Sequence, residues 1–563
     1  MRTKFLIIFS VVLFSFQGMA QKEEDDNKTG SINRNKPQRE EWLRDLGFGM
    51  FIHWSVDSQL GVVISHSLVG ASADYTNRFI KELPKTFDPY NYDAYRMAVQ
   101  AKLAGAKYLV LTAKHHSGFC LWDTKTTDFN ITNTPYKRDI VKEFVESTRK
   151  AGLAVGIYFS PEDFKFLHDN TISVQRGGLK FTKEIAAAYD ELARKQSNEL
   201  FTKYGKIDVF FIDGDPKETA RDEAWRCQPD VVITRGAVNT PEQHLPGTAS
   251  DQLWESCITM GTQWQYKPTN DDLKSGTRLI EILVETRAKG GNLLLNMGPK
   301  PDGTIPDPEE RRLTEMAAWN FINKEAIENV RPWVVVNEDN IWFTASKDRK
   351  TVYAIITGIP EWQFGKRKEF KLGSIRATPE TKISVLGQND KVVEYKLDAD
   401  AKSRFTQQED GLHISVVRAQ RIYNNYKWPN PITVKLENVE PALMPPLVIT
   451  GKAVASPGQV KLSGKLKSMG DAKQLNVYFE WRPYGGFVET LYSTEWNKIN
   501  DKIEMTATGE FSQILELDNN QTYEFRAVVA HPLLKLYGDK VRFYAKQNSI
   551  QPANSNTISG GHQ

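Results

Sequence analysis

Residues that can bind ligands or exchange protons recur at the ends of apolar runs between residues 49 and 298 of this 563-residue chain. In VLTAKHHSGF (110–119) an apolar run passes directly into Lys114, His115 and His116. The carboxyl ends of parallel strands in a barrel meet at one mouth, so such side chains would gather there. Each alone could cap a helix or fill a structural role, but that explanation would have to hold at seven strand ends together. The set comprises His53, His115, His116, Tyr158, Asp213, Arg235, Glu255 and Asn296.

Two familiar chemistries are disfavoured by the spacing of these residues. Successive side chains on a strand point to opposite faces, so His115 and His116 are poorly placed to bind one ion. No HxH or HExxH spacing occurs, and we predict no metal site. The sequence also lacks the GxSxG turn of many serine hydrolases.

Two carboxylates at strand ends offer a third chemistry. Asp213 follows the apolar run VFFI and precedes a glycine, and Glu255 lies two strands later. A pair of carboxylates is the minimum apparatus of a glycosidase, in which one attacks the anomeric carbon and the other protonates the leaving oxygen. Aromatic rings nearby could stack on the apolar face of a sugar. The candidates are Trp54, Phe211, Trp254, Trp264 and Tyr266.

The elements that would position these residues form an alternating pattern. Amphipathic runs of helical period separate the apolar runs, for example 138–152, 185–205 and 276–291. Alternating strands and helices require parallel strand pairing, which predicts an α/β fold with a (β/α)8-like barrel. A doubly wound sheet is the alternative, although no glycine-rich phosphate motif follows the first run. The apolar runs span 49–54, 107–113, 155–160, 208–213, 231–236, 251–256 and 292–298.

The remaining sequence predicts further segments. Residues 1–20 have the charge, apolar run and small residues of a cleaved signal peptide, which predicts a secreted or periplasmic protein without a membrane span. The net charge of +3 gives no reason to expect a nucleic-acid partner, and three cysteines do not support a disulfide framework. The predicted segments are a signal peptide (1–20), a flexible leader (21–40), a barrel (41–335), a β-sandwich (336–430), a fibronectin III-like all-β domain (440–548) and a loose tail (549–563).

Several stretches resemble glycoside hydrolase family 29, the α-L-fucosidases. They are GMFIHW, KYLVLTAKHHSGFCLWDT, VFFIDG, WESC and GGNLLLNMGPKPDGTIP, within about residues 48–333. The resemblance implies a (β/α)8-like barrel with a C-terminal β-sandwich and no metal or organic cofactor. It also implies hydrolysis of terminal α-L-fucosides from oligosaccharides or polysaccharides, with retention of configuration.

The resemblance assigns roles to individual positions. Asp213 matches the family nucleophile, and Glu255 matches a common position of the acid/base. Arg235 matches an arginine near the nucleophile. The residues expected to hold the sugar are His53, His115, His116 and Tyr158.

This chain departs from the family pattern in places. It has Ser55 after His53-Trp54 where a glycine is usual, and Phe211 where a tryptophan is usual. Such changes leave open a related retaining glycosidase acting on α-L-galactosides or a fucose-containing polysaccharide. The sequence also leaves open a non-catalytic carbohydrate-binding barrel and a metal hydrolase, and it does not predict the oligomeric state.

Overall fold

The computed structural model describes residues 33–422, 429–484, 495–517 and 520–545. The predicted signal peptide and tail therefore lie outside the described residues. The chain divides into two compact units, one of residues up to 440 without 246–248, and one of 246–248 and the residues from 441. All three cysteines are unpaired.

The first unit is built around a seven-stranded parallel sheet in the order β5-β4-β3-β2-β1-β7-β6. The strands β1 to β5 lie side by side in chain order, β6 lies beside β7, and β7 lies beside β1. This is the circular order of a barrel that is open between β5 and β6. This confirms the predicted α/β architecture with a curled parallel sheet. The strands are β1 (Phe48–Ile52), β2 (Tyr108–Lys114), β3 (Ala154–Phe159), β4 (Val209–Ile212), β5 (Val232–Ile233), β6 (Glu255–Thr259) and β7 (Asn292–Met297).

Side chains alternate between the inside of the curled sheet and the layer beneath the helices. Phe51 and Phe211 belong to an inner cluster, whereas Met50 and Phe210 pack in the cluster between strands and helices. This alternation follows from the two-residue period of a strand. Both faces are therefore apolar, which explains the nearly continuous apolar runs in the sequence.

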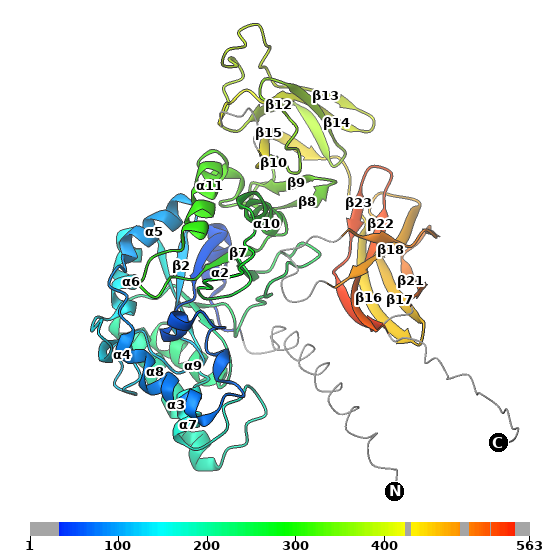
Figure 1. The fold of residues 1–563 in the computed structure, drawn as a ribbon. Coiled ribbons are helices and arrows are strands. Elements are labelled where there is room, and N and C mark those ends of the chain that lie inside the picture. The colour runs from blue at the N-terminus through cyan, green and yellow to red at the C-terminus, as the bar shows by residue number, and fades with distance from the viewer. Residues whose placement is uncertain (1–32, 423–428, 485–494, 518–519, 546–563) are drawn as a thin grey trace, which may run out of the picture. The chain divides into compact units, whose positions relative to one another are not determined.

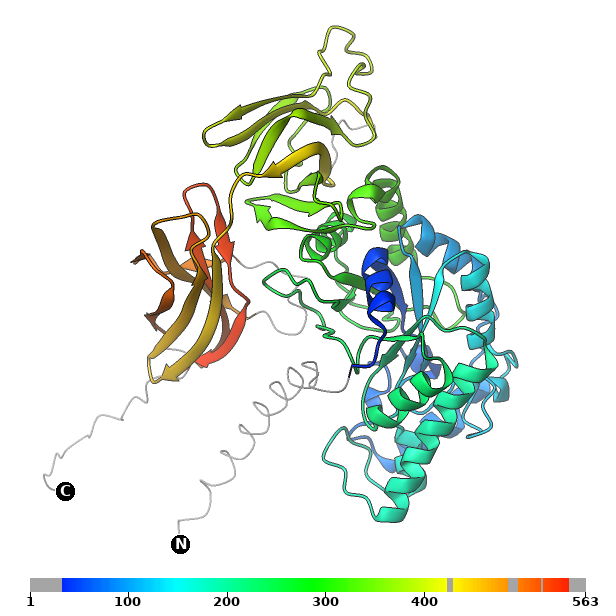
Figure 2. The ribbon, with the colours of Figure 1, turned by 180° about the vertical axis from the view of Figure 1, so that it is seen from behind.

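Helices surround the outer face of the sheet, as the two opposite views show (Figures 1 and 2). α2 begins at Pro37, inside the stretch predicted as a flexible leader, because Asn35 exchanges two hydrogen bonds with the backbone of Ile233. No helix among the described ranges is long and apolar enough to cross a membrane. The helices are α2 (Pro37–Leu46), α3 (Ala73–Lys81), α4 (Leu83–Thr86), α5 (Ala94–Leu103), α6 (Ile140–Lys150), α7 (Phe164–Asp169), α8 (Lys183–Lys203), α9 (Lys217–Cys227), α10 (Gly276–Ala288) and α11 (Asp307–Asn323).

An antiparallel β-domain completes the first unit. Its five-stranded sheet has the order β12-β15-β10-β9-β8 and its three-stranded sheet the order β11-β14-β13. β15 lies beyond the predicted boundary at residue 430, because it pairs with β10 over six residues. The strands are β8 (Arg331–Glu338), β9 (Ile341–Ala345), β10 (Thr351–Ile356), β11 (Arg367–Leu372), β12 (Ile375–Val385), β13 (Arg404–Gln408), β14 (Gly411–Val417) and β15 (Ile432–Pro441).

The second unit is also all-β. Val460 and Leu462 on one sheet and Phe479 and Phe525 on the other share a buried apolar cluster. Its likeness to a fibronectin III domain stays a prediction. Its strands are β16 (Leu447–Ser456), β17 (Gln459–Ser468), β18 (Leu475–Pro483), β19 (Asn497–Lys498), β20 (Ile503–Met505), β21 (Gly509–Glu516), β22 (Gln521–Ala530), β23 (Lys535–Tyr537) and β24 (Val541–Ala545).

Candidate active site

Asp213 lies at the carboxyl end of β4, the residue directly after Ile212. The Tyr158 hydroxyl donates a hydrogen bond to its Oδ2 at 2.9 Å. Two guanidinium groups face its Oδ1, Arg235 at 3.4 Å and Arg176 at 3.9 Å. The side chain of Asp213 is 20% exposed, so the carboxylate is reachable from solvent although it is surrounded by partners.

The charge state of Asp213 follows from these partners. Burial alone would raise its pKa. The charges of Arg235 and Arg176 and the hydrogen bond from Tyr158 outweigh burial and hold the pKa well below its usual range. Asp213 is therefore ionised at neutral pH, which is the state that a nucleophile requires.

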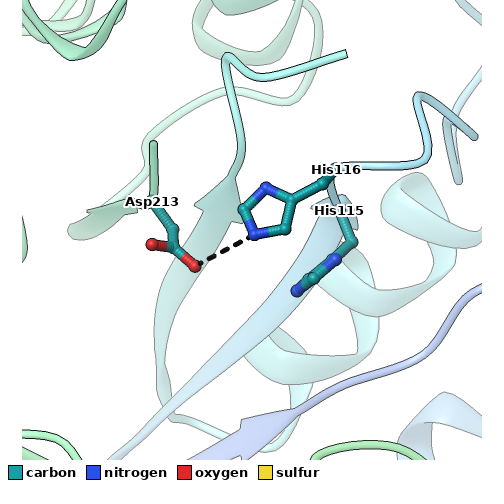
Figure 3. A group of neighbouring side chains, drawn as sticks. All are labelled: His115, His116 and Asp213. Atoms are coloured by element: carbon teal, nitrogen blue, oxygen red, sulfur yellow. Dashed lines mark ion pairs between the residues drawn. The ribbon is translucent and has the colours of Figure 1, made fainter. Parts of the chain in front are cut away.

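Three predicted histidines gather around this carboxylate. Figure 3 shows His116 pointing its Nε2 at Asp213 Oδ2, 3.7 Å away, with His115 beside it. The imidazole of His53 lies 6.0 Å from that of His115, centroid to centroid. Burial lowers the pKa of all three, that of His53 to about 3, so the rings are neutral at pH 7.

His115 and His116 do not face apart, which corrects the prediction from strand alternation. β2 ends at Lys114, so neither histidine is on the strand, and their ring centroids are 4.2 Å apart. One nitrogen from each ring and one oxygen of Asp213 lie within 4.8 Å of one another, a spacing that could hold a metal ion. Arg235 and Arg176 oppose a cation there, because both direct positive charge at the same carboxylate.

Tyr158 and Phe211 form the floor beneath the carboxylate. Their rings stack at 5.6 Å, and Tyr158 also stacks on His115 at 5.5 Å with the planes almost parallel. The guanidinium carbon of Arg235 lies 4.7 Å above the ring centroid of Phe211. The guanidinium covers this buried ring, so Phe211 supports Arg235 and is closed to a sugar. The structure thus places Tyr158 at the site as a hydrogen-bond donor to Asp213, and Phe211 beneath the Arg235 guanidinium.

Glu242, which the sequence analysis missed, is a second carboxylate on Arg235. Nη2 of Arg235 binds Glu242 Oε2 at 2.9 Å, while Nη1 of the same guanidinium faces Asp213. Glu242 lies in an irregular segment that runs along β6, with isolated bridges Asn239–Trp254 and Glu242–Cys257. That segment belongs to no regular strand, so a search of strand ends could not find it.

Glu162 and Arg176 form a further charged pair at the mouth, joined at 3.0 Å. Glu162 Oε2 lies 3.3 Å from Nδ1 of His116, on the opposite edge of the ring from Asp213. Burial raises the pKa of Glu162 to about 7, and the charge of Asp213 adds to the effect. Both residues come from the long connection between β3 and α8, where no periodic pattern marks them.

Glu255 does not lie with Asp213. It is the first residue of β6, is 0% exposed, and accepts a hydrogen bond from Tyr108, the first residue of β2. The strand was predicted over 251–256, which would have put Glu255 at its carboxyl end, whereas the strand runs over Glu255–Thr259. This corrects the prediction of Glu255 as acid/base, because a proton donor must reach the leaving oxygen.

Two of the predicted sugar-stacking rings are also buried elsewhere. Trp54 is 1% exposed and packs against Phe87 and Tyr92 in the layer beneath the helices. Trp254 is 2% exposed and donates a hydrogen bond to the carbonyl of Lys289. Neither can reach a sugar at the mouth.

Trp264 lies at the mouth instead. It is partly exposed, and its ring centroid lies 4.8 Å from that of His53. Its backbone carbonyl accepts a hydrogen bond from Asn296, the polar residue at the end of β7. This ring can therefore contact a ligand that the histidines hold.

Comparison with known proteins shows the family of the chain. The family profile described as Alpha-L-fucosidase matches residues 13–325, more than half of the chain. The plasma α-L-fucosidase of Rattus norvegicus is 29% identical over 394 residues, which cover 62% of this chain and 82% of that protein.

Solved structures extend the likeness to the fold. The α-L-fucosidase isoenzyme 1 of Paenibacillus thiaminolyticus is 26% identical with a TM-score of 0.57, covering 72% of this chain and 99% of that chain. The α-fucosidase of Thermotoga maritima in complex with a mechanism-based inhibitor is 26% identical with a TM-score of 0.55, covering 70% and 96%. Because the family profile matches more than half of the chain, the chain belongs to the α-L-fucosidase family, glycoside hydrolase family 29.

Proposed function

We propose that this protein is a secreted exo-glycosidase that removes terminal α-L-fucose from glycans with retention of configuration, with Asp213 as the nucleophile. The observation that carries the proposal is that one guanidinium, Arg235, binds two carboxylates at the barrel mouth. Retaining glycosidases require two carboxyl groups about 5–5.5 Å apart, and a shared guanidinium keeps both groups close. The mechanism-based inhibitor bound to the Thermotoga maritima relative is consistent with a covalent step.

Asp213 performs the first displacement. One carboxylate oxygen bonds to the anomeric carbon as the glycosidic C–O bond breaks, and the leaving oxygen takes a proton from the acid. Water then attacks the anomeric carbon and gives its proton to the residue that acted as the acid. The bond between the anomeric carbon and Asp213 breaks, which releases Asp213. Arg235 stabilises Asp213 as an anion before attack and after release.

Glu242 is our candidate for the acid/base. Its side chain is 24% exposed and lies across Arg235 from Asp213, so it can face the leaving group. Glu162 is the second candidate, because its pKa of about 7 suits a general acid. Glu162 also shares a guanidinium with Asp213, because Arg176 lies 3.0 Å from Glu162 and 3.9 Å from Asp213. Glu242 is favoured because its side chain is more exposed than that of Glu162, 24% against 12%, and its guanidinium lies closer to Asp213, at 3.4 Å.

Two experiments test these assignments. Labelling with a 2-fluoro-fucosyl fluoride should attach the sugar to the peptide that contains Asp213, and a label elsewhere would refute the nucleophile. Glu242→Ala should lose activity on natural glycans but retain it on aryl fucosides with good leaving groups. Azide should then yield a fucosyl azide of retained configuration, because it replaces the base-activated water. If Glu162→Ala shows this behaviour and Glu242→Ala does not, Glu162 is the acid/base.

The identity of the sugar is tested separately. Nitrophenyl α-L-fucoside should be hydrolysed far faster than the α-L-galactoside, which differs by a hydroxyl at the exocyclic carbon. The reverse order would favour the galactoside alternative. Binding of fucose without turnover by wild-type protein would favour a non-catalytic barrel.

Secretion is proposed from residues 1–20 alone. Expression in a bacterium with an intact export pathway should give a mature protein whose first residue is Gln21. An intact Met1 on the purified protein would refute cleavage at this site.

A further inference from the structure

Each of the three site histidines uses Nδ1 to contact a side chain of a second layer. A neutral imidazole carries one hydrogen, so the partner of Nδ1 decides whether Nε2 presents a donor or an acceptor. The partners are Asn296 for His53, Ser65 for His115 and Ser160 for His116. The hydrogen bonds of these partners fix the tautomer of each ring.

His53 is fixed by the orientation of an amide. Nδ2 of Asn296 donates to the backbone carbonyl of Trp264 at 2.6 Å, and a carbonyl can only accept. Oδ1 of Asn296 therefore faces His53 Nδ1, at 2.6 Å, and must accept from it. His53 carries its hydrogen on Nδ1, so its Nε2 is a bare acceptor.

His116 is fixed in the same sense by Ser160. The Ser160 hydroxyl donates to the backbone carbonyl of Glu162 at 3.3 Å, which leaves Oγ to accept from His116 Nδ1 at 2.6 Å. The Glu162 carboxyl, 3.3 Å from the same nitrogen, is a further acceptor in its ionised form. His116 Nε2 is then bare, and it faces Asp213 Oδ2 across 3.7 Å with no hydrogen between two acceptors.

His115 is fixed in the opposite sense by Ser65. Oγ of Ser65 already accepts a hydrogen bond from the backbone N–H of Ser117 at 2.9 Å. Ser65 is 0% exposed, and within the described ranges His115 Nδ1, at 2.9 Å, is the one acceptor in reach of its hydroxyl hydrogen. A buried hydroxyl hydrogen without an acceptor is costly, so Ser65 donates to Nδ1 and His115 carries its hydrogen on Nε2.

Asp57 holds Ser65 in the conformation that this contact needs. Ser65 has a φ of 59°, in the left-handed region that non-glycine residues seldom adopt. Its backbone N–H donates to Oδ2 of Asp57 at 2.7 Å, and Asp57 is 0% exposed. The buried carboxyl therefore anchors the turn from which Oγ reaches His115.

We propose that Ser65, anchored by Asp57, is a positioning residue that makes His115 a hydrogen-bond donor to the sugar. His53 and His116 are acceptors. The site therefore selects a sugar that offers hydroxyl hydrogens to two histidines and an oxygen to the third. The hydroxyl bound at His116 can also reach Asp213, since it would lie between two acceptors. This inference rests on the proposed function only in naming the ligand as a sugar.

The tautomers are measurable without turnover. Nitrogen NMR of the protein labelled with 15N-histidine distinguishes protonated from bare ring nitrogens, and single His→Gln variants assign the signals. We expect Nδ1–H for His53 and His116 and Nε2–H for His115. Ser65→Ala should change the His115 signals alone, whereas Ser67→Ala should change none, because Ser67 Oγ has no hydrogen-bond partner among the residues that the structure describes. Nδ1–H on His115 of the wild type would overturn the proposal.

Kinetics provide the second readout. Loss of a hydrogen bond to the sugar should lower kcat/KM of Ser65→Ala by about tenfold on the intact fucoside. That loss should vanish on the one deoxy-fucoside that lacks the oxygen bound by His115. Ser65→Gly suits the left-handed backbone and also lacks the hydroxyl, so it should show the same loss of kcat/KM. It replaces Ser65→Ala in the assay if the alanine variant folds poorly.

Asp57 variants separate anchoring from simple stability. Asp57→Asn keeps an oxygen for the Ser65 N–H and should preserve the His115 tautomer, whereas Asp57→Leu should not. An equal loss of Ser65→Ala on every deoxy-fucoside would refute the positioning role. A protein with the expected tautomers that hydrolyses no fucoside would refute the proposed function and leave the hydrogen-bond assignment standing.

Discussion

Replacement of Glu255 by glutamine separates a structural from a catalytic carboxyl. Burial raises the pKa of Glu255 to about 7 in the folded protein, whereas the unfolded chain releases this proton near the ordinary value of 4.5. Between these values the folded state holds more protons than the unfolded state, so stability falls as pH rises. At 1.36 kcal/mol for each pH unit, the loss amounts to about 3 kcal/mol at pH 8.

Glutamine cannot ionise and keeps an oxygen for the Tyr108 hydroxyl. We expect Glu255→Gln to be close to wild type in thermal stability at pH 4.5. It should be more stable than wild type by about 3 kcal/mol at pH 8, which corresponds to several degrees in Tm. Activity on natural fucosides should stay within a few-fold, because the side chain is closed to substrate.

The assay is thermal unfolding of both proteins from pH 4.5 to 8, followed by tryptophan fluorescence, with kcat/KM measured on the same samples. A Tm difference that does not grow with pH would show that Glu255 is not held protonated by burial. Loss of glycan hydrolysis with rescue by azide would return Glu255 to the catalytic role and refute the geometric argument.

Three further changes test the surroundings of the site. Lys114→Met should lower the free energy of unfolding in urea by about 3–5 kcal/mol. It removes the cation from a buried ion pair, whose side chains are 0% and 4% exposed, and leaves the carboxylate of Asp163 without its opposite charge. Gly214→Ala should lower kcat about 100-fold, because φ is 99° and the new Cβ would lie 2.7 Å from Glu162 Cγ, displacing the adjacent nucleophile. Trp264→Ala should raise KM about fivefold with a smaller effect on kcat, measured by steady-state kinetics, because it removes a ring that can contact the sugar.

Each of these has a contrary outcome. A loss below about 1 kcal/mol for Lys114→Met would show that water reaches the buried pair. Unchanged kcat in Gly214→Ala would show that the turn after the nucleophile can relax. An unchanged KM in Trp264→Ala would place the sugar away from His53.

The sequence was most informative where regular strands end. Asp213 could be found because a four-residue apolar strand stops directly before it. Glu255 was misplaced, because the sequence predicts a strand over 251–256 that includes Leu253 and Trp254, whereas the strand starts at Glu255. A shift of a few residues moves a side chain from one end of the barrel to the other.

Residues on irregular chain escaped the sequence analysis. Glu242 and Arg176 reach the mouth from segments without hydrophobic period, and only tertiary contacts bring them to Asp213. The joint orientation of His115 and His116 was also missed, because β2 ends one residue before them and strand alternation no longer applies. Periodicity reports secondary structure and carries no information on such loops.

The gap between β5 and β6 has a consequence for how this enzyme can change. β5 has only two residues. The irregular segment that carries Glu242 follows it in the chain and runs along β6 through two isolated bridges. Irregular segments tolerate insertions and substitutions that would break a strand ladder. The segment that carries Glu242, the proposed acid/base, can therefore vary, whereas Asp213, the proposed nucleophile, follows a strand that is hydrogen-bonded to β3 and β5. Under the proposed roles, changes in the irregular segment can alter which glycan linkage is cleaved while the position of Asp213 is kept.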